Sequence, residues 1–234
     1  MTTTLILLSG GLDSTVLAAH YYENGDDLHA LSVDYGQRHI RELDSARAVA
    51  DHYGIRHDTL DLRAFGQLLS GSALTDTAVS VPDGHYAEAS MKVTVVPNRN
   101  MVLLSAAAAV AVARGCDRIA TAVHAGDHFI YPDCRPAFIE AFRDTVALGN
   151  EGFARPGFTV ETPFIGWTKT AIVHLGHNLD APLYLSWSCY KGGDLHCGTC
   201  GTCQERRQAF AEACVGDPTG YADAATTYQA PAVP

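Results

Sequence analysis

Ser9-Gly10-Gly11-Leu12-Asp13-Ser14 stands directly after a short apolar run, residues 4–8, near the start of the chain. The run predicts a buried strand, the two glycines predict a tight turn, and the residues from Asp13 to about Asn24 predict a helix. A loop between a strand and a helix points backbone N–H groups at an anion, and the helix dipole adds to the attraction. This stretch therefore predicts a phosphate-binding loop.

Three side chains of the loop suit that role. Ser9 and Ser14 add hydroxyl donors, and Asp13 is suited to help hold a magnesium ion. The alternative interpretation is a Gly-Gly turn followed by an ordinary Ser/Asp helix cap. Two rival nucleotide motifs, Gly-Lys-Ser/Thr and Gly-x-Gly-x-x-Gly, are absent from the sequence.

Strands and helices are expected to alternate along the rest of the chain. Strands are expected at 28–33, 57–62, 118–123 and 158–162, and helices at 39–53, 101–114, 136–148, 168–175 and 204–214. This rhythm predicts an α/β fold with a doubly wound parallel sheet. Residues 63–97 interrupt it with glycines and prolines, which predicts either a functional lid or disorder.

Bulk composition narrows the class of protein. The 234 residues carry a formal net charge of −10 and 18% charged residues. That acidity argues against a general nucleic-acid surface, which needs clustered Lys and Arg. No run of about 18 apolar residues occurs, and the N-terminus has no basic region typical of a signal peptide. We therefore expect a cytoplasmic protein with no membrane partner.

Four of the seven cysteines crowd together: Cys189, Cys197, Cys200 and Cys203, with the spacing C-x7-C-x2-C-x2-C. Four thiolates with no open position are typical of a structural tetrahedral zinc site. Redox-active C-x-x-C pairs and an iron–sulfur cluster are the alternatives. We favour one structural zinc per chain. The predicted divisions of the chain are a nucleotide-binding domain at 1–184, a zinc-binding segment with a helix at 185–216, and a disordered tail at 217–234.

Three further segments stand at positions in the chain where ligand-binding loops are expected. They are Val33-Asp34-Tyr35-Gly36-Gln37-Arg38-His39, Val96-Pro97-Asn98-Arg99-Asn100 and Tyr131-Pro132-Asp133-Cys134-Arg135. All three fall at the carboxyl ends of expected strands or before a helix, where ligands bind in open α/β sheets.

The hexapeptide after the first strand resembles the signature of the PP-loop ATP pyrophosphatases, which have an adenine-nucleotide α-hydrolase-like fold and split ATP into AMP and pyrophosphate. Together with the three segments and the cysteine spacing, residues 4–215 resemble the 7-cyano-7-deazaguanine synthase family of the queuosine pathway. One departure is clear: many members have Asp-x-Ser-Gly where this chain has Asp127-His128-Phe129-Ile130.

The resemblance implies an ATP-dependent carbon–nitrogen ligase that turns 7-carboxy-7-deazaguanine and ammonia into 7-cyano-7-deazaguanine by two adenylylations. It implies a homodimer, Mg²⁺ and small-molecule substrates, and no nucleic-acid partner. The residues expected to bind ATP are Leu8, Ser9, Gly10, Gly11, Leu12, Asp13, Ser14, Thr15, Val16, Leu17 and Ala18.

The expected catalytic residues are Asp13, Ser14, Arg99 and Lys169. A planar Arg suits a carboxylate and a Lys acts as a point charge for phosphate, although a lone Arg or Lys is often only a solvated surface group. The residues expected to bind the substrate are Arg99, Asp133 and Arg135, although Pro132-Asp133 also suits a simple turn.

Two other functions are compatible with the loop. A PP-loop tRNA 2-thiolation enzyme shares it, but usually has an added RNA-binding domain. A non-catalytic nucleotide sensor would need the loop alone. The sequence leaves the source of ammonia open, since the chain contains no glutaminase domain.

Overall fold

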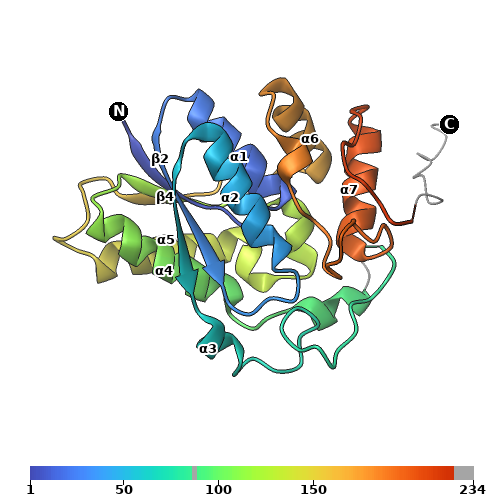
Figure 1. Cartoon of the computed structure of the whole chain (residues 1–234). Coiled ribbons are helices and arrows are strands. Elements are labelled where there is room, and N and C mark those ends of the chain that lie inside the picture. The colour runs from blue at the N-terminus through green and yellow to red at the C-terminus, as the bar shows by residue number, and fades with distance from the viewer. Residues whose placement is uncertain (86–88, 224–234) are drawn as a thin grey trace.

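The computed structural model describes residues 1–85 and 89–223, and within them five parallel strands form one sheet in the order β3-β2-β1-β4-β5 (Figure 1). The strands are β1 (Thr3–Leu7), β2 (Asp27–Asp34), β3 (Arg56–Asp61), β4 (Arg118–Ala120) and β5 (Thr159–Glu161). Each pairing is parallel, with Leu5 opposite His29 on one side and Ile119 on the other. The prediction of a doubly wound parallel sheet is confirmed.

Helices connect the strands and extend the chain beyond the sheet. The α-helices are α1 (Leu12–Glu23), α2 (Arg41–Tyr53), α3 (Arg63–Gly66), α4 (Arg99–Ala113), α5 (Pro136–Gly149), α6 (Lys169–Asn178) and α7 (Gly201–Glu212). The 3-10 helices are η1 (Ala89–Thr94), η2 (Ala125–Phe129), η3 (Pro132–Cys134) and η4 (Leu183–Leu185).

The sheet is buried on both faces, as its apolar strands require. In β1, Ile6 packs into the core beneath α1, α2 and α6, whereas its neighbour Leu5 packs into the core beneath α4 and α5. Leu31 and Ile119 join Leu5 on that second face, because side chains alternate along a strand. Figure 1 shows the two groups of helices on opposite sides of the sheet.

The strand order places a ligand crevice at the end of β1. The chain runs from β1 to β2 and β3 on one side, and then crosses back to β4 and β5 on the other. The loops that leave β1 and β4 therefore diverge, which opens a crevice at the carboxyl ends of these strands. Residues 9–11 form the loop that leaves β1, and residues 12–14 form the first turn of α1.

The long connection between β3 and α4 packs against the cysteine segment. Ala73 and Val81 share a buried cluster with Trp187 and Cys189, and the guanidinium of Arg38 donates to the carbonyls of Asp76 and Val79. Asp83 also forms an isolated antiparallel bridge with Cys200. Residues 63–85 therefore have a defined structure, and the expectation of disorder is wrong for them.

Helix α7 joins the cysteine segment to the sheet domain. Arg206 is 1% exposed, and its guanidinium donates to the hydroxyls of Ser186 and Ser188 and to the carbonyl of Leu183. Side by side in Figure 1, α6 and α7 also pack together through Ile172, Val173, Ala209 and Phe210.

Part of the expected tail, 217–223, lies against α7. The hydroxyl of Tyr221 donates to Asp217 over 2.6 Å, and the guanidinium of Arg207 lies 3.9 Å from the centre of the Tyr221 ring. Residues 224–234, the remainder of the tail predicted to be disordered, lie outside the described residues. The division into 1–184, 185–216 and 217–234 stays a prediction.

One described segment, Met91–Ala113, is long and apolar enough to cross a membrane by composition, and 28% of it is buried. It contains the last part of η1 and all of α4, and Asn98 between them has a left-handed backbone, with φ of 54°. Leu104, Ala107 and Ala111 of α4 pack on the sheet. The segment thus includes a core helix, and on its own it is weak evidence for a membrane span.

Candidate active site and metal centre

A cleft at the carboxyl ends of β1, β2 and β4 is lined along one wall by the predicted phosphate loop. Leu8, Ser9, Gly11, Leu12, Asp13 and Ser14 all face it. Gly10 instead faces α2 with φ of 83°, where an added Cβ would lie 2.1 Å from the carbonyl oxygen of Glu42. Only glycine fits this close approach, so the loop is held by its contact with α2.

The last part of the predicted ATP segment does not reach the cleft. Thr15 donates its hydroxyl to the carbonyl of Gly11, and Val16, Leu17 and Ala18 are fully buried in the core of α1. These four residues hold the loop in place from behind.

Lys169 begins α6 and crosses the cleft to the loop. Its Nζ lies 2.7 Å from Oδ2 of Asp13 and 3.3 Å from Oε2 of Glu205, which is on α7. Elements far apart in the sequence thus bring one cation and two carboxylates together. The side chains are only 14–21% exposed, so water screens their charges weakly.

Neighbouring charges outweigh burial in setting the pKa values of Asp13 and Lys169. Burial alone would raise the pKa of Asp13, but Lys169 and His124 outweigh it and hold that pKa below its usual range. Burial alone would likewise lower the pKa of Lys169, but Asp13 and Glu205 raise it instead. Lys169 is therefore a cation and Asp13 an anion at neutral pH.

His124 extends the cluster after β4. It is 1% exposed, and its Nδ1 accepts the N–H of Gly126 over 3.1 Å. Its Nε2 lies 3.2 Å from Nζ of Lys169, 3.6 Å from Oδ2 of Asp127 and 3.8 Å from Oδ2 of Asp13. His124 thus helps to orient the carboxylates opposite Lys169.

The opposite wall of the cleft is aromatic and contains Arg99, the first residue of α4. Its guanidinium lies 5.5 Å from the centre of the Tyr131 ring, and Tyr35 and Tyr190 also surround it. Within residues 1–85 and 89–223, no carboxylate pairs with Arg99. A half-buried cation without a counter-ion suits an anionic ligand.

Two predicted substrate residues lie elsewhere. Oδ2 of Asp133 accepts the backbone N–H of Asn100 over 2.9 Å and so holds the start of α4. Arg135 is exposed and donates to the carbonyl of His128. The structure brings Asp13, Ser14, Arg99 and Lys169 to one cleft. Asp133 and Arg135 are not among the residues that line it.

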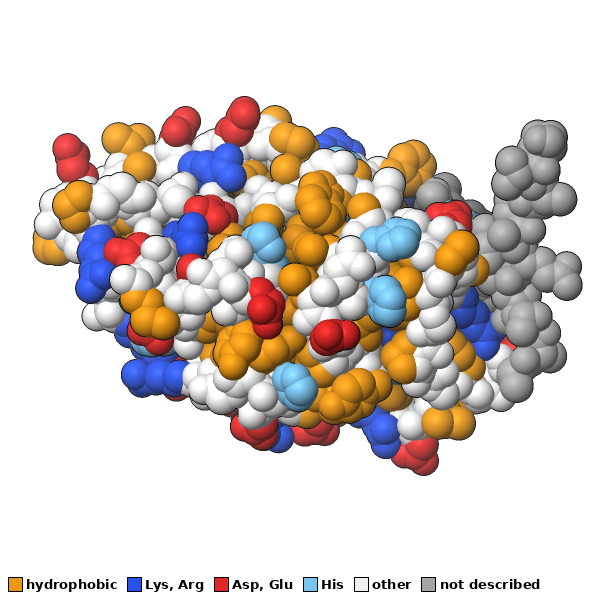
Figure 2. Space-filling model, turned by 90° about the horizontal axis from the view of Figure 1, so that it is seen from above, with side chains coloured by type: hydrophobic (Ala, Val, Ile, Leu, Met, Phe, Trp, Pro, Cys, Tyr) orange, Lys and Arg blue, Asp and Glu red, His pale blue; other side chains and the backbone are white. Residues whose placement is uncertain are grey.

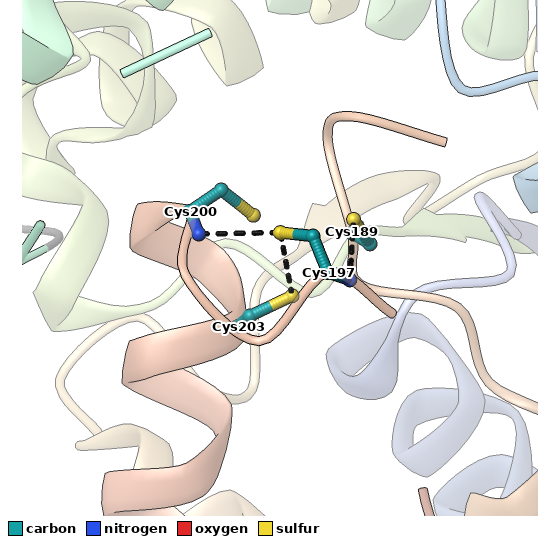
Figure 3. A group of neighbouring side chains, drawn as sticks. All are labelled: Cys189, Cys197, Cys200 and Cys203. Atoms are coloured by element: carbon teal, nitrogen blue, oxygen red, sulfur yellow. Dashed lines mark hydrogen bonds between the residues drawn. The ribbon is translucent and has the colours of Figure 1, made fainter. Parts of the chain in front are cut away.

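The four cysteines predicted to bind metal come together beside the start of α7, as Figure 3 shows. Their sulfur atoms lie within 4.8 Å of one another, and those of Cys197 and Cys203 are 3.9 Å apart. Tetrahedral Zn–S bonds of about 2.3 Å place ligand sulfurs about 3.8 Å apart, so the donor set and spacing fit zinc. Three of the four side chains are buried, so the centre is closed to substrates.

The cysteine centre and the cleft share helix α7. Thr202 and Glu205 face the cleft, and Glu205 follows Cys203 by two residues. Sequence reasoning missed Glu205 and His124, because neither belongs to a recognisable motif. The sequence carried no signal for Glu205, because its place at the cleft depends on how α7 packs on α6.

Charges on the face seen in Figure 2 are mixed. Lys and Arg side chains are scattered among acidic and hydrophobic ones, and they form no continuous basic patch on the coloured part of that face. This matches the acidic composition, with 26 Asp and Glu against 16 Lys and Arg.

Comparisons with known proteins agree with one another. The family model for Queuosine biosynthesis protein QueC matches residues 3–214. A curated relative from Ruegeria pomeroyi, 7-cyano-7-deazaguanine synthase, is 54% identical over 220 residues, which cover 94% of each chain. A relative of the same name from Brucella ovis is 52% identical over 221 residues, again covering 94% of each chain.

A solved structure supports the fold alone. The structure described as a 4-thiouridine synthetase–RNA complex with bound ATP is similar with a TM-score of 0.51 and 15% identity. The similarity covers 77% of this chain and 41% of that one.

Proposed function

This chain belongs to the queuosine biosynthesis protein QueC family, and on that premise we propose that it is an ATP-dependent 7-cyano-7-deazaguanine synthase. One observation carries the proposal: the 54% identity to a curated synthase extends over 94% of both chains. The cleft adds independent support, because it combines a phosphate loop with a buried lysine and a separate cation.

The reaction joins 7-carboxy-7-deazaguanine and ammonia in two ATP-dependent stages. The carboxylate attacks the α-phosphate, pyrophosphate leaves, and ammonia displaces AMP to give an amide. The amide oxygen then attacks the α-phosphate of a second ATP and pyrophosphate leaves; loss of AMP and of both protons on the amide nitrogen gives the nitrile. In both stages adenylylation converts an oxygen of the substrate into a good leaving group. Positioning of the substrate and ATP, and neutralisation of charge on the phosphates, therefore provide most of the catalysis.

ATP binds along the loop of residues 8–14. Backbone N–H groups and the hydroxyls of Ser9 and Ser14 contact the phosphates, and Lys169 neutralises charge that develops around the α-phosphate. Arg99, across the cleft, holds the substrate carboxylate until it attacks. Asp133 and Arg135 act on the substrate only indirectly, through the start of α4 and the loop after β4.

The cleft fits Mg²⁺ through Asp13. Its Oδ1 is buried and has no hydrogen-bond partner among the described residues, while Oδ2 binds Lys169. A hard divalent cation prefers such a carboxylate oxygen together with phosphate oxygens. Bound there, Mg²⁺ would neutralise the leaving pyrophosphate.

Zinc is the metal proposed for the four cysteines. Held by Cys189, Cys197, Cys200 and Cys203, it stabilises the segment that begins α7. Its role is structural, because four thiolates leave no position open for a substrate.

The remaining assignments complete the proposal. The enzyme acts in the cytoplasm as a homodimer on free small molecules, without a nucleic-acid or membrane partner. Sedimentation of the purified protein at several concentrations tests the dimer.

The deciding experiment is incubation with ATP, Mg²⁺, ammonium and 7-carboxy-7-deazaguanine, with products identified by mass. We expect the nitrile, with two AMP and two pyrophosphate formed per nitrile. Pyrophosphate release that does not depend on the deazaguanine would contradict the proposal. Binding of ATP without any turnover would identify a nucleotide sensor.

A further inference from the structure

Glu42, in the first turn of α2, faces the cleft on the same side as the aromatic wall. Its side chain is 15% exposed, and its Oε2 lies 3.2 Å from Nε2 of His39, which is 2% exposed. Within residues 1–85 and 89–223, His39 is the only partner that forms an ion pair with Glu42. The ATP-binding and carboxylate-binding roles proposed above leave this carboxylate without a function.

Such a carboxylate is costly unless a ligand supplies donors. A mostly buried carboxylate loses hydration, and each of its oxygens can accept about two hydrogen bonds, whereas among the described residues only His39 lies within ion-pair distance of Glu42. The ring of His39 is itself fixed between Glu42 and Tyr190, whose ring centre lies 5.2 Å away. His39 therefore holds Glu42 in one orientation, toward the cleft.

Glu42 and Arg99 line the cleft together with the same tyrosines. Burial raises the pKa of Tyr35, and the Glu42 carboxylate raises it further while Arg99 lowers it. Burial likewise raises the pKa of Tyr190, with Arg99 again lowering it and Glu42 raising it. Both phenols therefore lie near an anion and a cation, and Glu42, Arg99, Tyr35 and Tyr190 all line the same cleft.

We propose that Glu42, oriented by His39, recognises the edge of the deazaguanine ring that carries N1–H and the 2-amino group. This assignment rests on the proposed function. Each part of the substrate then meets a complementary group. Its carboxylate binds Arg99, its planar ring lies between the tyrosines, and its two N–H donors bind Glu42. Bases are commonly held in this way, by stacking on aromatic side chains and hydrogen bonds to one edge.

The chemistry of Glu42 also selects against other bases. A carboxylate only accepts hydrogen bonds, so it matches the two adjacent donors of a guanine-type edge. The corresponding edge of adenine presents an acceptor at N1, which would face the carboxylate unfavourably. Glu42 therefore keeps ATP from occupying the substrate end of the cleft.

The test is Glu42→Gln, which keeps the shape of the side chain but removes its charge and one acceptor. We expect the KM for 7-carboxy-7-deazaguanine to rise about tenfold or more, the cost of one lost bidentate base contact, with the KM for ATP unchanged. A second substrate, 7-carboxy-7-deazahypoxanthine, lacks the 2-amino group. The wild type should prefer the parent substrate, and the variant should lose most of that preference.

Asp44→Asn is the matched control, because Asp44 lies in the same turn of α2 but is 74% exposed and pairs with Arg47. It should leave every KM unchanged. If the wild type forms the nitrile and Glu42→Gln keeps both the KM and the preference, the inference is overturned while the function stands. An increase confined to the KM for ammonium, or an equal increase in all KM values, also overturns it. Absence of nitrile with the wild type would instead refute the proposed function.

Discussion

Asp13 uses its two carboxylate oxygens differently, and this difference explains why it is needed. Oδ2 is 2.7 Å from Nζ of Lys169, whereas Oδ1 is buried and finds no partner within residues 1–85 and 89–223. A buried polar atom without a partner is costly in a folded protein, and such atoms mark functional sites. The loop therefore holds Asp13 ready for a ligand.

Asp13→Ala should reduce the rate of nitrile formation by at least about 100-fold, since it removes both the proposed Mg²⁺ ligand and the partner of Lys169. Ser14→Ala should have a similar effect, because the hydroxyl faces the cleft. Circular dichroism and the Tm should show that both variants fold. Near-normal turnover by either variant would refute the assignment of the ATP site.

Glu205→Gln should lower kcat roughly tenfold, because Lys169 loses one of the two carboxylates that position it. Zinc content and Tm should stay at wild-type values, which separates positioning from folding. Glu212→Gln is the control: it lies on the same helix but is exposed, and it bonds Thr170 and Gln208. Equal effects of the two substitutions would contradict a specific role for Glu205.

Individual residues show what the sequence could reveal of the site. Asp13 lies in a loop whose flanking strand and helix were predictable, so its place at the cleft followed. Glu205 lies on a helix whose docking depends on long-range packing of α7 on α6, which no local pattern encodes. Asp133 was expected at the substrate because it follows a strand, but its carboxylate binds the N–H of Asn100 instead.

At the level of elements, the phosphate loop is fixed by its contact with α2. Gly10→Ala should lower the free energy of unfolding by roughly 3 kcal/mol or more, because left-handed strain adds to overlap with the Glu42 carbonyl. Gly25→Ala is the control, since Gly25 has φ of 77° but open space around it. It should cost only the strain, about 1–2 kcal/mol in urea unfolding. Equal losses would mean that the loop can move away from α2.

The cysteine segment should depend on one metal ion. Metal analysis should find about one zinc and no iron per chain. Cys200→Ser should lower the Tm by more than about 5 °C, and activity should fall in step with the folded fraction. Cys214→Ser is the control: Cys214 is exposed, and its replacement should leave the Tm unchanged. Brown protein containing iron and labile sulfide, or an unchanged Tm after chelation, would contradict the zinc assignment.

The elements show where sequence reasoning succeeded and where it failed. The strands and helices were predictable because their apolar residues recur with a clear period, and Gly54 ends α2 in a left-handed conformation. Residues 63–85 carry no such period. Ala73 and Val81 are buried only because Trp187 and Cys189, distant in sequence, pack on them.

For the whole molecule, the net charge of −10 predicts indifference to RNA. Added tRNA should change neither kcat nor KM, and no micromolar binding should occur at physiological salt. Labelled tRNA in a fluorescence titration provides the measurement. Tight binding that weakens with salt would favour the thiolation enzyme over the synthase.

The order of the chain also sets when the enzyme becomes active during its own synthesis. The phosphate loop leaves the ribosome first, within the first fifteen residues, whereas Lys169 and Glu205 emerge near the end. A nascent chain can thus hold β1, its loop and their helix long before the catalytic cation reaches them. We expect such a chain to turn over no ATP, because Lys169 and Glu205, which line the cleft, are not yet in place.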